Sequence, residues 1–290
     1  MNKDILIIIG PTAIGKSAFA IETARKKKAE IISADAFQVY KYMDIGTAKI
    51  SEEEQKIVKH HLIDIKTPDE PYSVKEFIER TNEIISNLRK NNTPVIICGG
   101  TGFYINAFLY GYEFNDMTSK DLDIRARLTD ESKKIGSTKF WQKLHSIDPK
   151  AANLIDQKNT RRVVRALEIF YTTDRLPSEF RKKTTQPRAD VEIVGLINDR
   201  AIFYDRINKR VDKMIELGLI DEVRDLLKKG YEDNTQAFEA LGYKEVIMYL
   251  KGSINKEEMI ELVKTKTRQF AKRQMTWFNR FENVKWINVS

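Results

Sequence analysis

Short apolar runs alternate with amphipathic stretches along the first hundred residues. Ile5–Ile9 and Pro94–Cys98 have the length of a buried strand, and glycine follows each of them. A third run, Glu30–Ala34, lies between them. Two stretches with apolar residues at helical spacing, 17–28 and 73–91, separate the three runs. Strands that alternate with helices in this way predict a parallel sheet covered by helices on both faces.

The stretch 73–91 has the clearest helical pattern. We expect Ser73 to cap its first turn, and Glu76, three residues later, to complete a capping box. Its apolar residues recur every three or four positions and predict one buried face: Val74, Phe77, Ile78, Ile84, Ile85 and Leu88.

The pattern changes after about residue 114. Residues 116–189 are charged, favour helices and contain no run typical of a buried strand. The residues beyond them favour two more strands, at 192–197 and 284–289. They also favour three helices, at 202–217, 219–229 and 256–280. We therefore predict an α/β core formed by residues 1–115 and 190–290, interrupted by a mainly helical insert domain over 116–189.

Composition excludes several classes of protein. Hydrophobic residues make up 41% of the chain, enough to build a core, so a mainly disordered chain is excluded. The single cysteine, Cys98, excludes a disulfide scaffold and a cysteine-rich zinc site. The first apolar run is too short to cross a bilayer, and Gly10-Pro11 makes it a poor signal peptide. We expect a soluble protein of a reducing compartment.

The net charge of +8 is concentrated in two windows. Residues 157–188 contain nine basic and three acidic residues, and residues 261–290 contain seven basic and two acidic ones. Clustered basic residues are typical of a protein that binds a polyanion. The alternative is a solvated helix face.

Residues 10–17 match the phosphate-loop pattern G-x-x-x-x-G-K-[ST] in full, between a predicted strand and a predicted helix. Backbone N–H groups and the helix N-terminus of such a loop surround a phosphate. We expect Lys16 to reach a terminal phosphate and the Ser17 hydroxyl to contact Mg²⁺. The expected binding residues are Gly10, Pro11, Thr12, Ala13, Ile14, Gly15, Lys16 and Ser17. The motif predicts a diphosphate or triphosphate ligand and leaves open which one.

Asp35 directly follows the predicted strand at 30–34. Ligands of parallel α/β sheets bind outside the carboxyl ends of the strands, so we expect Asp35 to face the phosphate-loop ligand from the neighbouring strand end. A carboxylate there can hold Mg²⁺ through water or act as a general base. Gln38 can bind a nucleobase edge. The alternative for Asp35 is a turn or capping residue.

Further motifs follow the phosphate loop in order. They are the strings at 33–49, 60–64, 99–104, 161–168, 240–245 and 267–277. Together they resemble the tRNA isopentenyltransferase family, the bacterial tRNA dimethylallyltransferases, from about residue 4 to residue 286. Many enzymes share the phosphate loop, whereas D-x-x-Q-V-Y-x-x-M-D-I-G-T-A-K from Asp35 and A-K-R-Q-x-T-W from Ala271 are much more specific. Ile14, Ala36 and Phe103 differ from the usual family residues without removing a group assigned to chemistry.

The resemblance implies a P-loop NTPase-like parallel sheet core with an inserted, mainly helical tRNA-binding domain. It implies transfer of a dimethylallyl group from dimethylallyl diphosphate to N6 of adenine 37, in the anticodon stem-loop of tRNAs that read codons beginning with U. The phosphate loop then holds the diphosphate leaving group rather than ATP, with Mg²⁺ as cofactor. We expect a cytoplasmic monomer that binds no membrane.

The resemblance also assigns roles to residues. Asp35 is the base, and Lys16, Thr101 and Arg206 contact the diphosphate, with Arg210 as the alternative to Arg206. The expected tRNA-binding residues are Asp35, Ala36, Phe37, Gln38, Thr101, Arg125, Arg161, Arg162 and Arg165, with Arg127 as the alternative to Arg125. A second basic patch consists of Arg268, Lys272 and Arg273. Phe37 or Tyr40 is expected either to stack on the base or to pack in the core, and His60 and His61 are expected to be structural.

Three other functions remain possible from the sequence. A small-molecule kinase would use the same phosphate loop but would turn over ATP without tRNA. A relative that prenylates free AMP would not need the basic insert. A plain RNA-binding module would bind tRNA without releasing diphosphate.

Overall fold

The computed structural model describes residues 4–112, 119–180 and 186–289. Contacts between residues divide the chain into two compact units. Unit 1 consists of Met1–Leu109 and Arg188–Ser290, and unit 2 is Tyr110–Pro187. The backbone N–H of Arg188 donates to the carbonyl of Leu109 at 2.9 Å, so the chain leaves and re-enters unit 1 at one point.

Unit 1 contains a six-stranded sheet in the order β3-β2-β4-β1-β5-β6. Every pair of neighbouring strands is parallel, which confirms the predicted parallel sheet. The strands are β1 (Ile5–Ile9), β2 (Glu30–Ser33), β3 (His60–His61), β4 (Val95–Cys98), β5 (Val191–Ile197) and β6 (Val284–Asn288).

The order of the strands corrects one expectation. The strand before Asp35 is not the neighbour of the strand before the phosphate loop, because β4 lies between β2 and β1. Ile97 of β4 pairs with Ile7 of β1 on one side and with Ile32 of β2 on the other. The carboxyl ends of the three strands therefore still lie in one row.

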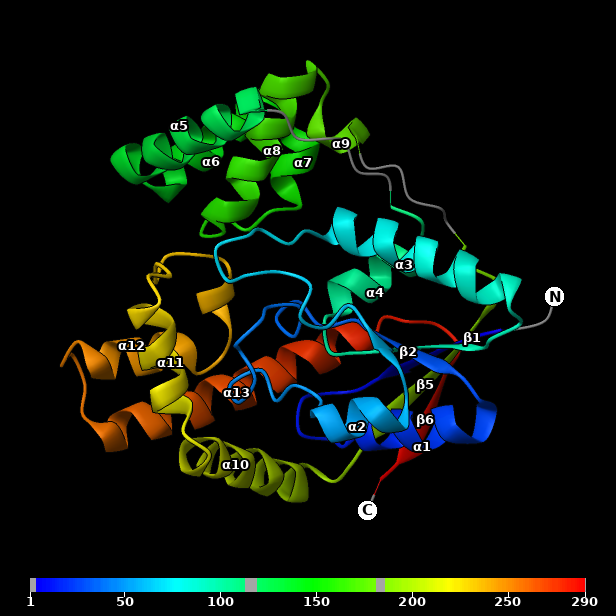
Figure 1. Cartoon of the computed structure of the whole chain (residues 1–290). Coiled ribbons are helices and arrows are strands. Elements are labelled where there is room, and N and C mark those ends of the chain that lie inside the picture. Colours follow the sequence, from blue (N-terminus) through cyan, green and yellow to red (C-terminus); the bar gives the residue numbers. More distant parts are fainter. Residues whose placement is uncertain (1–3, 113–118, 181–185, 290) are drawn as a thin grey trace. The chain divides into compact units, whose positions relative to one another are not determined.

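Helices cover both faces of the sheet, as the sequence predicted; Figure 1 shows α1 and α2 along one face and α3 and α4 along the other. The helices of unit 1 are α1 (Lys16–Lys27), α2 (Glu52–Ile57), α3 (Val74–Lys90), α4 (Gly102–Leu109), α10 (Arg200–Glu216), α11 (Leu219–Lys228), α12 (Tyr243–Leu250) and α13 (Lys256–Phe278), with a 3-10 turn, η1 (Ala237–Glu239). The core beneath α1 joins Ala20 and Ala24 to Ile8, Ile31 and Ile96 from three strands. Removing such side chains from water is the main driving force for folding.

The capping box predicted for α3 forms only in part. The Ser73 side chain accepts the N–H of Glu76, as expected. The Glu76 carboxylate is instead engaged by Lys66 at 3.1 Å and by Arg80 at 2.9 Å. Lys66, from the preceding loop, and Arg80, one helical turn later, thus compete with the Ser73 N–H for the Glu76 carboxylate.

Three short helices were not predicted, α2, α4 and α12, because each is too short to show a clear period in the sequence. The two-residue strand β3 confirms that His60 and His61 lie in a strand-like run. In β3, His61 Nε2 lies 2.5 Å from the Glu30 carboxylate on β2, and burial lowers the pKa of His60. These contacts give the histidine pair a structural setting at the sheet edge.

All regular elements described in unit 2 are helices. It consists of α5 (Ser119–Ile135), α6 (Ser137–Ile147), α7 (Pro149–Asn153), α8 (Thr160–Thr173) and α9 (Pro177–Phe180). It has a core of its own, in which Leu128, Phe140 and Leu167 are fully buried. The role of unit 2 as a separate tRNA-binding domain stays a prediction. In the described part of the whole chain, no helix is both long and apolar enough to traverse a membrane.

Candidate functional site

Unit 1 has a cavity of about 470 Å³ at the carboxyl ends of β1, β2 and β4. The segment after each strand supplies one residue with a predicted catalytic role to its lining: Lys16 after β1, Asp35 after β2 and Thr101 after β4. Helices α10 and α13 supply the opposite wall. This placement follows the general rule that ligands of parallel sheets bind at the carboxyl edge.

The phosphate loop runs from the end of β1 into the N-terminus of α1. Gly15 caps α1 with φ at +98°, a left-handed conformation that glycine adopts at little cost. Lys16 Nζ donates to the carbonyl of Pro11 at 2.7 Å. Burial lowers the pKa of the Lys16 ammonium to about 8, and the nearby Arg210 acts in the same direction. An anion in the loop would offset the cost of holding both cations there.

The side chains of Asp35 and Thr101 both accept backbone N–H groups of residues 36–38. Asp35 Oδ1 accepts the N–H groups of Phe37 at 2.9 Å and Gln38 at 3.3 Å. Thr101 Oγ1 accepts the N–H of Ala36 at 3.1 Å. One oxygen of Asp35 thus forms the turn that was the alternative role predicted for this residue. Within the described residues, its other oxygen enters no hydrogen bond and is free for chemistry.

Gln38 and Phe37 line the same cavity, but the Gln38 amide is already bonded. It accepts from the Ser33 hydroxyl at 3.1 Å and donates to the carbonyls of Thr47 and Ala48 at 3.4 and 3.2 Å. Base recognition by Gln38 stays a prediction, and it requires exchange of at least one of these bonds. Tyr40 is fully buried, which supports the core alternative for that side chain.

Arg206 and Arg210 are one turn apart on α10, and only Arg210 is among the described residues that line the cavity. Burial lowers the pKa of the Arg210 guanidinium, the negative charge of Asp35 acts in the opposite direction, and Arg210 in turn lowers the pKa of Lys16. A cation kept in a desolvated position is ready for an anionic ligand. The geometry therefore favours Arg210 over Arg206 as the diphosphate contact.

Gln274 of α13 is a site residue that the sequence interpretation did not single out. Its Oε1 accepts the N–H of Thr12 at 2.8 Å, and its Nε2 donates to the carbonyl of Gly100 at 2.9 Å. The side chain is 4% exposed and bridges the phosphate loop to the loop of Thr101. The available signal was a polar residue on the buried stripe of a helix, between Ala271 and Phe278, because buried amides are nearly always bonded.

A large part of the cavity lining is apolar. It includes Phe103, Leu241, Val263, Phe270 and Trp277, with Glu239, Thr267 and Arg273 as polar neighbours. The cavity lining thus combines cationic and polar groups with hydrocarbon and aromatic surface. Such a lining suits a ligand with an anionic head and a short apolar tail.

The predicted tRNA-binding arginines of unit 2 have a different environment. Arg125 makes two bonds of 2.9 Å to the Glu168 carboxylate, and Arg165 makes one of 2.7 Å. Glu168 has a side chain only 1% exposed, so these arginines neutralise a buried charge as well as facing solvent. Arg161 and Arg162 on α8 are exposed. Arg181, Lys182 and Lys183 of the basic window lie outside the described residues.

In the second predicted basic patch, Arg268 is engaged in hydrogen bonds within the protein, whereas Lys272 and Arg273 are exposed and can meet a ligand. Arg268 donates to Asn208 at 2.6 Å and to Thr265 at 2.9 Å, which ties α13 to α10. Lys272 and Arg273 are exposed, and Arg273 lines the cavity. Arg273 is therefore the member of this patch best placed to meet a ligand.

Mg²⁺ fits the donor set of the cavity only in one mode. Across the ranges that the structure describes, no group of three or more His, Cys, Asp or Glu side chains is arranged to hold a metal. The Ser17 hydroxyl and the Asp35 carboxylate line the cavity together. Mg²⁺ commonly binds through one or two protein oxygens, waters and substrate phosphates, and this pair suits that mode.

Sequence comparison shows full-length similarity to known proteins. The sequence model described as IPP transferase matches residues 38–281. A tRNA dimethylallyltransferase of Acetivibrio thermocellus is 47% identical over 287 residues, 98% of this chain and 91% of that protein. A tRNA dimethylallyltransferase of Alkaliphilus oremlandii is 46% identical over 291 residues, 100% of this chain and 93% of that protein.

Solved structures give the same result. A full-length tRNA isopentenylpyrophosphate transferase from Bacillus halodurans is 40% identical, with a TM-score of 0.72 over 99% of this chain and 90% of that one. A eukaryotic dimethylallyltransferase acting on tRNA is 27% identical, with a TM-score of 0.83 over 98% of this chain and 73% of that one. These likenesses, with the parallel sheet, confirm the predicted P-loop NTPase-like fold.

We expect Gln274→Leu to weaken binding of inorganic diphosphate about tenfold, because the buried Thr12 N–H and Gly100 carbonyl lose their partners. Titration calorimetry measures this affinity. Gln236→Leu is the matched control, since the Gln236 amide also makes two backbone bonds, to Tyr72, outside the lining of this cavity. Equal losses in the two variants would contradict a specific role for Gln274.

Proposed function

The chain belongs to the IPP transferase family, and from this premise we propose that it transfers a dimethylallyl group from dimethylallyl diphosphate to N6 of adenine 37 in tRNA. The family membership confirms the resemblance carried by the motifs. One observation carries the proposal: a phosphate loop, an apolar wall and a carboxylate with a free oxygen share one cavity. The restriction to tRNAs that read codons beginning with U stays a prediction.

The donor binds with its diphosphate in the phosphate loop and its five-carbon chain against the apolar wall. Lys16 and Arg210 offset the charge that develops on the departing diphosphate. Thr101 Oγ1 already accepts a backbone N–H, which leaves its own O–H to donate to the oxygen that leaves the allylic carbon. Mg²⁺, held by the Ser17 hydroxyl, supplies further positive charge to the diphosphate when bound.

The acceptor needs a base because its exocyclic amine is a poor nucleophile, with a lone pair delocalised into the ring. As the bond from N6 to the allylic carbon forms, the bond from that carbon to the diphosphate oxygen breaks. The N6 proton passes to the free oxygen of Asp35, while its other oxygen stays bonded to Phe37 and Gln38. This bonded oxygen fixes the direction of the carboxylate, which suits a general base.

The adenine reaches the cavity by leaving its stack in the anticodon loop. Extrusion costs a few kcal/mol and least from a single-stranded loop, which suits the proposed acceptor. Phe37 at the cavity is the aromatic side chain that we propose to stack on the base. Arg161 and Arg162, with Arg125 and Arg165 held by Glu168, are proposed to meet the tRNA phosphates.

The other functions are less well supported. The curated relatives are named tRNA dimethylallyltransferases over the full length of this chain, which does not favour a small-molecule kinase. The apolar wall beside the phosphate loop also fits a prenyl chain better than a second phosphate. A plain RNA-binding module has no use for Lys16, Thr101 and Asp35 in one cavity.

The direct test is incubation with dimethylallyl diphosphate, Mg²⁺ and unmodified tRNA that carries adenines at positions 36, 37 and 38. We expect N6-(dimethylallyl)adenosine at position 37, detected by mass spectrometry of the digested tRNA, with one diphosphate released per adduct. Replacing adenine 37 with guanine is the control and should abolish transfer. Turnover of ATP without tRNA, and no adduct, would replace the proposal with the kinase alternative.

We expect Asp35→Asn to reduce the rate of transfer at saturating substrates by two to four orders of magnitude, in the range typical for loss of a general base. The tRNA affinity should stay within a fewfold, because asparagine keeps an oxygen for the turn to Phe37 and Gln38. Single-turnover kinetics and filter binding separate the two effects. A variant as fast as the parent would remove Asp35 as the base.

Arg206 and Arg210 form a matched pair on one helix. We expect Arg210→Met to raise the KM for dimethylallyl diphosphate by at least about tenfold, because a desolvated cation in the cavity lining can bond the diphosphate directly. Arg206→Met should change the KM by less than about twofold, because Arg206 is not among the described residues that line the cavity. The opposite ranking would restore Arg206 as the diphosphate contact.

A further inference from the structure

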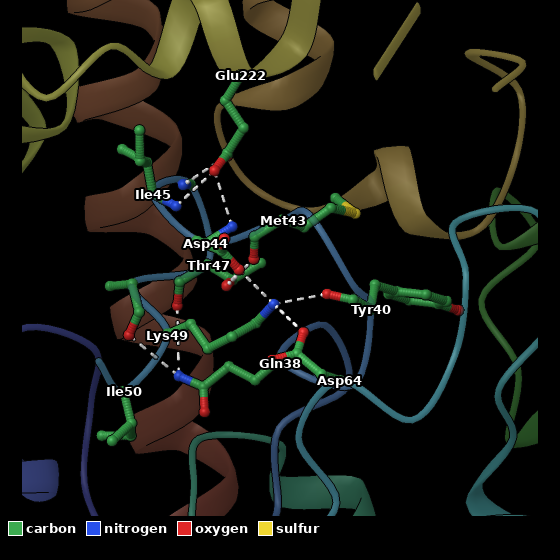
Figure 2. Close-up of polar contacts among 12 residues, drawn as sticks. Gln38, Tyr40, Met43, Asp44, Ile45, Thr47, Lys49, Ile50, Asp64 and Glu222 are labelled. Atoms are coloured by element: carbon green, nitrogen blue, oxygen red, sulfur yellow. Dashed lines mark hydrogen bonds and ion pairs between the residues drawn. The ribbon is translucent and has the colours of Figure 1, made fainter. Parts of the chain in front are cut away.

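The segment from Tyr40 to Ile50, which we call loop 40–50, has three backbone N–H groups that donate to the carboxylate of one residue outside the loop. Glu222 of α11 reaches this loop across more than 170 positions of sequence. Figure 2 shows its carboxylate pointing into the loop from the α11 side, with Lys49 and Gln38 on the other side of the same loop.

Glu222 satisfies three successive backbone donors. Its Oε2 accepts the N–H groups of Asp44 at 2.8 Å and Ile45 at 2.7 Å, and its Oε1 accepts the N–H of Gly46 at 3.1 Å. Successive N–H groups that surround one anion form a nest, a concavity that binds negative charge. Glu222 also lies in the first turn of α11, where the helix dipole favours a negative charge.

Tyr243 fixes the distance between the nest and α12. Its hydroxyl donates to Glu222 Oε1 at 2.6 Å, and its ring is fully buried. A Cβ atom on Gly46 would lie 2.4 Å from Cε2 of this ring, so only glycine allows the loop to approach so closely. The D-I-G-T-A-K and A-L-G-Y-K-E strings thus meet at Glu222, which lies in neither.

The inner side of loop 40–50 is bonded just as fully. Lys49 donates to the Tyr40 carbonyl at 2.7 Å and to the carboxylates of Asp44 and Asp64 at 2.6 Å each, with a side chain 4% exposed. The carbonyls of Thr47 and Ala48 accept the Gln38 amide. A shift of the nest would therefore move the partners of Gln38.

Loop 40–50 forms part of the cavity wall near Asp35 and Gln38. Its contribution consists of Gly46, Thr47 and Ala48. The hydrogen bonds of Glu222 go to this loop and to Tyr243, whereas the phosphate loop is held separately by Gln274. The two sides of the cavity are thus positioned by different residues.

We propose that Glu222 is a positioning residue for the acceptor side of the cavity, which sets loop 40–50 and, through Thr47 and Ala48, the Gln38 amide. This inference rests on the proposed function, because the acceptor side is the side that takes the adenine. Loss of the Glu222 carboxylate therefore impairs use of tRNA and leaves diphosphate binding intact.

The test is Glu222→Gln in the full chain. Glutamine has the same size but turns an NH₂ group toward N–H donors, so the nest loses one acceptor. We expect kcat/KM for tRNA at saturating dimethylallyl diphosphate to fall at least tenfold. We expect the Kd of inorganic diphosphate to change by less than twofold. Hydrogen exchange at the amides of residues 44–46 should become faster in the same variant.

Two further variants control the test. Tyr243→Phe removes one of the four bonds to the carboxylate and should give an intermediate loss with tRNA; it carries the test if Glu222→Gln fails to fold. Asp221→Asn alters the adjacent residue, which is 71% exposed and pairs with Arg224, and should match the parent. Equal losses in tRNA use and diphosphate affinity, or no loss with tRNA, would overturn the inference.

The outcomes also separate this inference from the proposed function. If the parent protein makes no tRNA adduct, the proposed function fails whatever Glu222 does, and with it the acceptor role. If the parent makes the adduct and Glu222→Gln matches it, only the inference about Glu222 fails.

Discussion

Hydrogen bonding between the ends of β2 and β4 is the constraint on which the site depends. The Ala34 N–H donates to the Cys98 carbonyl at 2.8 Å, and the Thr101 N–H donates back to the Ala34 carbonyl at 3.2 Å. These bonds continue the ladder past the last strand residues, so Asp35 and Thr101 leave the sheet side by side. Because β4 also pairs with β1, the phosphate loop leaves at the same edge. Register in the sheet thus decides which groups meet in the cavity.

Much of this arrangement was predictable from local sequence. Ile5–Ile9 and the phosphate loop were predicted with their observed roles in the fold, because a buried strand, a glycine turn and a helix are adjacent in the chain. The strand order was not predictable, since periodicity shows where strands are and not which of them pair. The expectation that β2 is the neighbour of β1 was therefore wrong, because β4 lies between them, whereas Asp35 does lie at the carboxyl edge of the sheet. The choice between Arg206 and Arg210 likewise depends on how α10 is turned toward the cavity.

The residues that the sequence did not reveal act over long separations. Gln274 bonds Thr12 across 262 positions, and Glu222 bonds Asp44 across 178. In unit 2, Glu168 binds Arg125 from another helix, so a residue expected to serve only tRNA also balances a buried charge. A charge pattern reports which residues are basic, but the partner of each one is set by packing. The cavity is therefore held by polar side chains to which the sequence interpretation gave no role, although one of them, Gln274, belongs to a specific motif.

The place of β1 between β4 and β5 has a consequence for the order in which the protein is made. Unit 2 has its own core and lies between β4 and β5 in the chain, so all of it is synthesised before β5, the second of the two strands beside β1. Helix α13, which carries the partner of Thr12, follows later still. Domains generally fold as units during synthesis. A nascent chain that already contains the whole phosphate-loop motif therefore still lacks one flanking strand and the side chain that holds the loop.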